Sequence, residues 1–165
     1  MKITILHSGR DSHAICFACK TARYLDRAGY EINFYDMLDY PPEFIHNETH
    51  LLIMSNSLLN GEANENAAPL WSYLCDESRR YALSNLHYSV LALGQFALPY
   101  SFNCALDFHA HLRRHNARLL SPSLMLDMTQ PLHFAEWLDR VDRQLRQSHT
   151  NSLPEVVQKN GGLGQ

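Results

Sequence analysis

The stretch that decides the fold reads KITILHSGRDSHAICFACKTARYLDRAGYEINFY, residues 2–35. It opens with an apolar run over residues 2–7, rich in β-branched side chains, that stops at Ser8 in the manner of a buried parallel strand. A helical repeat of apolar residues follows from Ser12 to Gly29, and glycine is typical of a helix end. A second apolar strand over residues 31–35 comes next. The order strand, helix, strand predicts a parallel sheet with a crossover helix.

The same alternation continues through most of the remaining chain. Strands are predicted at residues 51–54 and 88–93, and a fifth strand at 118–120 is interrupted by Pro122 and resumes at 124–126. Helices are predicted at residues 66–80, 100–116 and 130–147. Five parallel strands with right-handed crossovers and helices on both faces predict an α/β three-layer sandwich with strand order 2-1-3-4-5.

Length and composition indicate one globular domain. The chain has 165 residues, of which 45% are hydrophobic and 19% charged, and this is ordinary globular composition. We assign residues 1–147 to the domain. Residues 148–165 are expected to form a polar, mobile tail, because the sequence there is polar and ends in a glycine-rich segment.

Charge and targeting signals exclude several classes of partner. The formal net charge is −3 with both signs interleaved, so no clustered basic surface indicates nucleic-acid binding. No apolar stretch is long enough to span a bilayer, and the N-terminal run is too short for an export signal. Four cysteines in a chain of this size do not indicate a secreted disulfide framework. A cytoplasmic protein without nucleic-acid or membrane partners is therefore expected.

Two stretches carry a resemblance to a known family. LLIMSNSLLNGEANENAAPLW, residues 51–71, resembles the apolar strand, Thr-x-Thr-Tyr-Gly-Glu-Gly, Asp-Asn-Ala and Phe-x-x-Trp-Leu of the FMN domain of diflavin reductases, such as sulfite reductase flavoprotein. YSVLALGQFALP, residues 88–99, is similar to that family's Tyr-x-Val-Phe-Gly-Leu-Gly-Asp-x-x-Tyr. The resemblance covers residues 1 to about 147 without gaps. It implies a flavodoxin-like fold and an FMN-dependent electron carrier.

A cofactor would bind at the loops that follow the first, third and fourth strands, because ligands of such sheets lie outside the carboxyl ends of the strands. The candidate cofactor-binding residues are Ser8, Gly9, Arg10, Asp11, Ser12 and His13 in the first loop, Ser55, Asn56, Ser57 and Leu58 in the second, and Gly94, Gln95 and Leu98 in the third.

Several of these residues depart from the family's pattern. Asp11 places a carboxylate where the family's phosphate loop has a hydroxyl donor, although Arg10 and His13 would offset its charge. Leu58 and Leu98 stand where the family has the aromatic residues that stack on the flavin, and such contacts contribute on the order of 1 kcal/mol each. The departures predict a degraded FMN site that disfavours the cofactor, in a domain that acts by binding a protein or another ligand.

Two alternatives stay open. In the first, Phe96, Tyr100 or Tyr40 stacks on FMN from a shifted position, and the chain transfers electrons to a reductase or oxygenase partner. In the second, residues 8–12 bind a nucleotide, because they resemble the PP-loop of ATP pyrophosphatases minus one glycine; the simpler interpretation is a strand–helix turn with Ser12 as N-cap. No catalytic triad pattern is present, so we expect an electron carrier or binding domain without catalytic residues of its own.

Three further groups of residues have structural interpretations. Cys16 and Cys19 are expected to lie buried on the apolar stripe of the first helix, not to form a redox pair. Trp71 and Trp137 are expected to anchor the core. The residues His109, His111 and His115 cluster on one predicted helix, where no further ligand completes a metal site, and a solvated helix face is expected.

Overall fold

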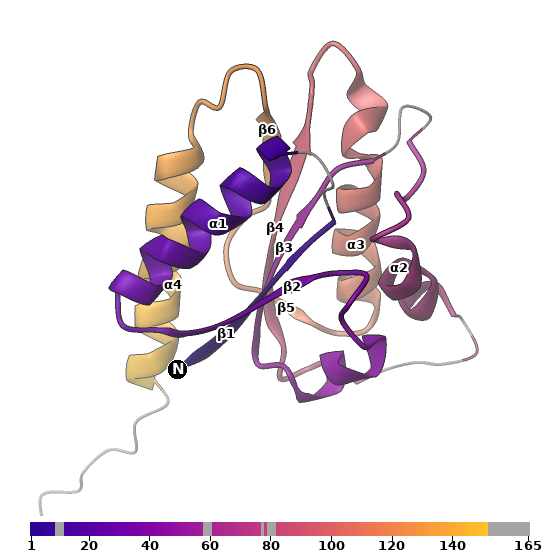
Figure 1. The fold of residues 1–165 in the computed structure, drawn as a ribbon. Coiled ribbons are helices and arrows are strands. Elements are labelled where there is room, and N and C mark those ends of the chain that lie inside the picture. The colour runs from indigo at the N-terminus through magenta and orange to yellow at the C-terminus, as the bar shows by residue number, and fades with distance from the viewer. Residues whose placement is uncertain (9–11, 58–60, 77, 79–81, 152–165) are drawn as a thin grey trace, which may run out of the picture.

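The chain forms a three-layer α/β sandwich around a parallel sheet (Figure 1). The computed structural model describes residues 1–8, 12–57, 61–76, 78 and 82–151. In chain order the elements are β1 (Lys2–His7), α1 (Ser12–Arg27), β2 (Glu31–Asp36), the 3-10 turn η1 (Pro42–Asn47), β3 (His50–Ser55), α2 (Ala68–Cys75), β4 (His87–Gly94), the 3-10 turn η2 (Pro99–Phe102), α3 (Asn103–Arg114), β5 (Arg118–Leu119), β6 (Leu124–Asp127) and α4 (Phe134–Asn151). The strand order is β2-β1-β3-β4-β5, so the predicted order 2-1-3-4-5 is confirmed.

The fifth strand of the prediction is two short strands. Both pair in parallel with β4: β5 pairs beside His87 and Tyr88, and β6 pairs with the segment from Leu91 to Gly94. Pro122 lies between them, and because proline has no N–H it cannot donate to the ladder. The sheet therefore has six strands, the sixth being the continuation of the predicted fifth.

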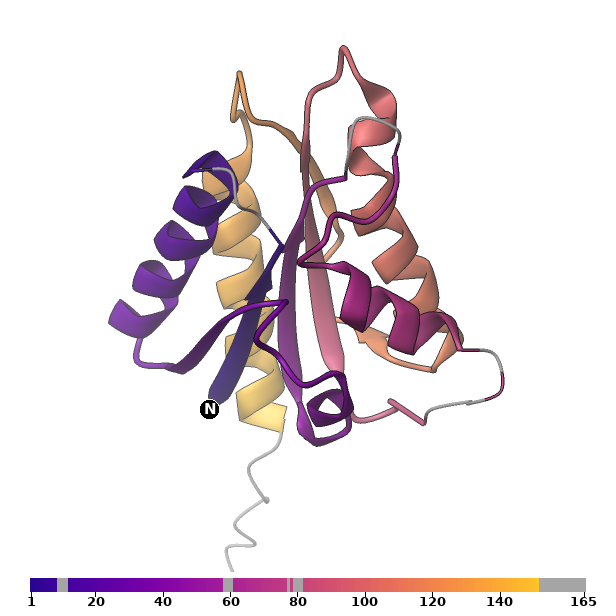
Figure 2. The same ribbon diagram turned by 45° about the vertical axis from the view of Figure 1, so that its right-hand side comes forward.

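Two hydrophobic clusters cover the two faces of the sheet. On one face, Ile3 and Ile5 of β1 pack with residues of α1 and α4, including Phe17 and Trp137. On the other face, Leu6 belongs to the cluster that contains residues of α2 and α3. This alternation along β1 follows from the two-residue period of a strand. Figure 2 shows the same arrangement from the side, with α1 and α4 on one side of the strands and α2 and α3 on the other.

Helix boundaries differ from the predicted ones by several residues. Helix α2 ends at Cys75, because Asp76 has extended backbone angles. Helix α4 begins only at Phe134, directly after His133, whose φ of +67° cannot continue a helix. It runs to Asn151, so the predicted domain boundary at residue 147 falls inside this helix. Residues 152–165 of the predicted tail lie outside the described residues.

The prediction for the two helical cysteines is wrong. Cys16 is exposed and Cys19 is half-buried. The buried face of α1 is instead formed by Ala14, Phe17, Ala18, Thr21 and Leu25. Phe17 sets this phase, since its ring packs edge-on against Phe134 with the centroids 5.0 Å apart. A residue next to Phe17 then lies about 100° around the helix, which turns Cys16 toward solvent.

The predicted solvated histidine face is also wrong. His115 is buried, and its Nε2 donates to the backbone oxygen of Leu74 at 3.0 Å. His109 Nδ1 lies 3.1 Å from the Tyr88 hydroxyl, so this helix side faces the sheet and α2. Among the described residues, no group of three or more histidine, cysteine or acidic side chains could hold a metal ion.

The tryptophans behave as expected. Trp137 of α4 is buried in the core cluster beneath α1 and α4, and Trp71 of α2 is partly buried against the opposite cluster. Within the described part of the chain, no helix combines the length and apolar character that crossing a lipid bilayer requires.

Candidate functional site

The carboxyl ends of the parallel strands meet at one side of the sheet, which we call the carboxyl edge. Its described residues are Ser8, 55–57, 61–67, 94–102 and 127–133. The strand order reverses direction between β1 and β3, because β1 has β2 on one side and β3 on the other. Ligands of open α/β sheets bind outside such a switch point, so this edge is the candidate site.

The first and second loops of the edge are joined by side-chain hydrogen bonds. Ser8 is buried, and its Oγ lies 2.8 Å from Oγ of Ser55 at the end of β3. Asn64 Nδ2 donates to Ser8 Oγ at 3.2 Å and to Asn56 Oδ1 at 3.0 Å. Asn64 Oδ1 accepts from the backbone N–H of Ala67 at 2.9 Å, just before α2. One asparagine therefore ties both loops to the start of a helix.

The second and third loops are joined in the same way. The backbone N–H of Ser57 donates to the Ser101 carbonyl at 2.9 Å. Ser57 Oγ accepts from the N–H of Cys104 at 2.7 Å, which satisfies one of the free donors in the first turn of α3. Ser101 Oγ accepts from the N–H of Gln95 at 3.0 Å. The hydroxyls of this part of the edge thus have partners within the protein.

Cys104 sits beneath this network as an unreactive thiol. The residue is buried, and Ser55 Oγ donates to its Sγ at 3.5 Å. Burial raises the pKa of the Cys104 thiol to about 11, and the bond from Ser55 offsets only part of that rise. The thiol is therefore protonated at neutral pH.

The third loop turns tightly after Gly94. A Cβ at Gly94 would overlap Ser101 Oγ and lie 2.9 Å from Cε1 of the Phe102 ring. The N–H of Leu98 donates to the Gln95 carbonyl at 2.9 Å, and the Leu98 side chain is half-buried. Leu98 therefore presents an aliphatic side chain in a closed turn of the third loop.

Asp127 at the end of β6 fastens the tip of the third loop. Its Oδ2 accepts from the N–H of Phe96 at 2.9 Å, and its Oδ1 accepts from the Thr129 hydroxyl at 2.6 Å. The bonds from Thr129 and Phe96 lower the pKa of the Asp127 carboxyl. Beside it lies a small pocket of about 150 Å³ lined by Phe96, Met125, Asp127, Gln130, Leu132 and His133.

Three large apolar side chains are exposed at this edge. Phe96 is 61% exposed, Tyr100 47% and Leu132 66%. Tyr40 does not belong to this surface: it is 1% exposed, and its hydroxyl donates to Glu48 at 3.2 Å. The alternative in which Tyr40 stacks on a cofactor is therefore wrong, whereas Phe96 and Tyr100 present accessible rings.

A buried histidine lies directly behind the edge. His7, the last residue of β1, is 5.0 Å from the Phe34 ring between centroids. Burial lowers the pKa of His7, and the attraction of Asp36 only partly offsets this effect. Asp36 itself accepts two bonds from Asn66 Nδ2, at 2.8 and 2.7 Å, which connect the end of β2 to the second loop. Because its pKa is lowered, the imidazole of His7 is neutral at physiological pH.

The structure brings together the candidate residues that it describes. Those at the carboxyl edge are Ser8, Ser55, Asn56, Ser57, Gly94, Gln95 and Leu98. Ser12 and His13 begin α1, and their side chains are outside the description, as are the whole residues Gly9, Arg10, Asp11 and Leu58.

The sequence analysis missed Asn64, Ser101 and Asp127, whose side chains bond within and between the loops of the edge. Asn64 lies just before the segment matched to Asp-Asn-Ala in the related family, and this is the only signal that pointed to it.

The fold and the position of this site define a flavodoxin-type α/β domain, and the chain belongs to the flavodoxin family, whose model matches residues 13–147. It is 31% identical over 135 residues to the sulfite reductase (NADPH) flavoprotein alpha-component of Shewanella sp. (strain MR-7), covering 82% of this chain and 22% of that protein. It is 26% identical over 147 residues to the protein of the same name from Bacillus subtilis (strain 168), covering 89% of this chain and 24% of that protein. The chain thus spans less than a quarter of each of these two relatives.

Solved flavodoxins share the fold at low sequence identity. The flavodoxin of Streptococcus pneumoniae TIGR4 superimposes with a TM-score of 0.79 at 14% identity, over 90% of this chain and 99% of that one. Oxidised Flavodoxin 1 from Bacillus cereus gives a TM-score of 0.74 at 12% identity, over 88% of this chain and 98% of that one.

Proposed function

We propose that this chain is a flavodoxin-family domain with a degraded FMN site that acts by binding another protein at its carboxyl edge. One observation carries the proposal. The described serine and asparagine side chains of the edge are hydrogen-bonded within the protein, while large apolar side chains are exposed around them.

The bonded side chains support the loss of the cofactor. FMN needs donors for a phosphate and polar contacts for its ring, yet the hydroxyls of Ser8, Ser55, Ser57 and Ser101 all have protein partners. Redirecting the buried Ser8–Ser55 pair to a ligand would break a bond worth roughly 1 kcal/mol net, and more where one of the two hydroxyls is left without a partner.

The aliphatic third loop supports the same conclusion. A flat ring at the position of Leu98 would contribute on the order of 1 kcal/mol by stacking, and the leucine does not supply it. Since about 1.4 kcal/mol corresponds to a factor of ten in affinity, a few such losses weaken binding by orders of magnitude.

The exposed apolar residues support protein contact. Phe96, Tyr100 and Leu132 lie on loops at one edge of the sheet and are each exposed by 47% or more. Exposed apolar patches, and aromatic residues above all, are typical of protein interfaces. The partner expected here is a protein with a complementary apolar surface.

The second candidate function is FMN-dependent electron transfer, the property that the family implies. It is favoured by the accessible rings of Phe96 and Tyr100, which flank Leu98 in the third loop. When bound, FMN would supply the redox chemistry, and the protein would supply its position and electrostatic surroundings. A nucleotide at residues 8–12 stays a third prediction, which ATP-dependent thermal stabilisation lost in Ser8→Ala would support.

Titration with FMN distinguishes the first two candidates. We expect no stoichiometric yellow complex from the purified chain with excess FMN, and measurable binding by the Leu58→Tyr/Leu98→Tyr double variant. The matched control is Leu106→Tyr, an exposed leucine on α3. A yellow wild-type complex that Phe96→Leu/Tyr100→Leu abolishes would instead establish the electron carrier.

A further inference from the structure

A second surface feature lies on the outside of the α1–α4 layer. It is a groove of about 620 Å³ between the second half of α1 and the middle of α4. Its walls carry Lys20, Arg23 and Arg27 from α1 and Arg146 from α4, and Tyr24 and Leu138 add apolar surface. The volume lies within the range of ligand-binding clefts.

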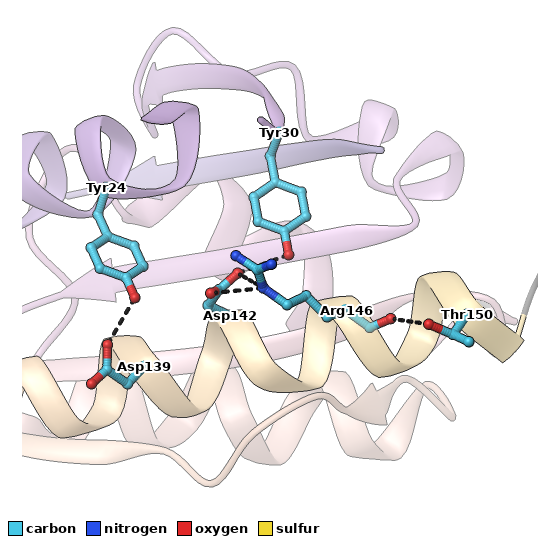
Figure 3. A network of polar contacts seen from close by, with 6 residues as sticks. All are labelled: Tyr24, Tyr30, Asp139, Asp142, Arg146 and Thr150. Atoms are coloured by element: carbon cyan, nitrogen blue, oxygen red, sulfur yellow. Dashed lines mark hydrogen bonds and ion pairs between the residues drawn. The ribbon is translucent and has the colours of Figure 1, made fainter. Parts of the chain in front are cut away.

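Two tyrosine–aspartate bonds hold the walls of the groove together (Figure 3). Tyr24 on α1 donates to Asp139 Oδ1 at 2.8 Å, and Tyr30, just after α1, donates to Asp142 Oδ1 at 2.8 Å. Arg146 Nε donates to the two oxygens of Asp142 at 3.2 and 3.1 Å. The groove is therefore a fixed feature of the helix layer.

The positive charges of the groove exceed its negative ones. The four cations face Asp142 in the lining and Asp139 at its side, which leaves an excess of two positive charges in a chain of net charge −3. Both carboxylates already accept a tyrosine hydroxyl. Among the described residues, no carboxylate forms an ion pair with Lys20, Arg23 or Arg27.

The spacing of the cations indicates the shape of the ligand. Lys20, Arg23 and Arg27 are three and four residues apart, so they form a row on one face of α1 with about one turn, or 5.4 Å, between neighbours. A helix with a carboxylate on each turn presents the same repeat. A small polyanion is instead held by converging donors such as the N–H groups of a helix N-terminus, and this row lies in the second half of α1.

We propose that the α1–α4 groove docks an acidic helical segment of a partner protein. Carboxylates on successive turns of that segment pair with the row on α1 and with Arg146, whose side chain is 62% exposed, while its apolar residues contact Leu138 and Tyr24. The proposal concerns a surface separate from the carboxyl edge and does not depend on whether FMN binds.

The test uses the full chain and a fluorescein-labelled alanine-rich helical peptide with glutamate on every turn. Fluorescence anisotropy at low ionic strength should give saturable one-to-one binding that weakens as salt is added, because the contacts are exposed ion pairs. The same peptide with glutamine in place of glutamate should not bind. The triple variant Lys20→Gln/Arg23→Gln/Arg27→Gln should lose at least tenfold in affinity.

The matched control removes one lysine and two arginines that are exposed outside α1 and α4: Lys2→Gln/Arg113→Gln/Arg118→Gln. It changes the net charge equally and should keep the affinity within twofold. Equal losses in both triple variants, or no binding of the glutamate peptide, would overturn the proposal. So would tighter groove-dependent binding of inorganic tripolyphosphate or of phosphatidylserine vesicles, since the groove would then be a small-anion or membrane site.

Discussion

The carboxyl edge and the α1–α4 groove differ in which side chains are hydrogen-bonded within the protein and which are left exposed. At the edge, serine and asparagine side chains satisfy one another, and the residues left exposed are apolar. In the groove, tyrosine hydroxyls satisfy the carboxylates, and the residues left exposed are cations. The chemical character of each surface therefore depends on which polar side chains are already hydrogen-bonded within the protein. This comparison predicts that an apolar partner selects the edge and an acidic one selects the groove.

The largest expected effect comes from breaking the closed edge at Gly94. In Gly94→Ala the new methyl group overlaps Ser101 Oγ and presses on the buried Phe102 ring, which should lower the free energy of unfolding by about 3 kcal/mol. Urea denaturation measures the loss. Adding Ser101→Ala removes one of the clashing atoms, so the double variant should be less destabilised than the sum of the single changes. Strict additivity would show that the overlap is relieved elsewhere.

The next effect concerns the frame of the groove. Asp142→Ala removes the acceptor for Tyr30 and for Arg146 in a buried position, and should cost about 2 kcal/mol of stability. The control Asp139→Ala removes an exposed acceptor on the same helix and should cost about 0.5 kcal/mol. Thermal unfolding of both variants checks the difference. Equal costs would mean that burial of the Tyr30–Asp142 bond contributes nothing.

The pH dependence of stability tests the Tyr30–Asp142 hydrogen bond by itself. Burial and the bond to Asp142 raise the pKa of Tyr30 to about 12, against about 10 in the unfolded chain. Because the folded state holds the proton more tightly, this stabilisation is complete below pH 10 and is lost as the pH rises toward 12. Tyr30→Phe should be about 1 kcal/mol less stable than wild type at pH 8. This difference in the free energy of unfolding between wild type and Tyr30→Phe should become smaller between pH 10 and 12 in urea denaturation series. A difference that stays constant over this range would contradict the raised pKa of Tyr30.

The smallest effect is expected from the cations themselves. Lys20→Gln/Arg23→Gln/Arg27→Gln removes exposed charges without ion-pair partners among the described carboxylates, so stability should change by no more than about 0.5 kcal/mol. Calorimetry at low and high salt measures the change. A large loss would mean that the row stabilises the fold, and the groove would then no longer be a free docking surface.

Much of the architecture could be predicted from local patterns. The apolar runs and the glycine after α1 were enough for β1, α1 and β2, since each depends on periodicity over a few residues, and the strand order followed from the right-handed crossover rule. Helix phase was harder. The stripe drawn through Cys16 and Cys19 missed Phe17, whose partner Phe134 is far away in the chain. The described residues of the loops after β1, β3 and β4 lie at the carboxyl edge, as the strand order requires, but the bonds between these loops were not predicted.

By itself, the sequence determined the strands, the helices and the family, because strand and helix periods, proline breaks and motif spacing are local properties. The strand order and the two helical layers followed from these elements through the right-handed crossover rule. Only the tertiary structure decided which polar side chains are hydrogen-bonded within the protein and which side chains stay exposed to a partner. Ser8 meets Ser55 from 47 positions away, and Tyr30 meets Asp142 from 112 positions away. Such pairs form only when the packed layers place them within hydrogen-bond distance, so no local pattern encodes them.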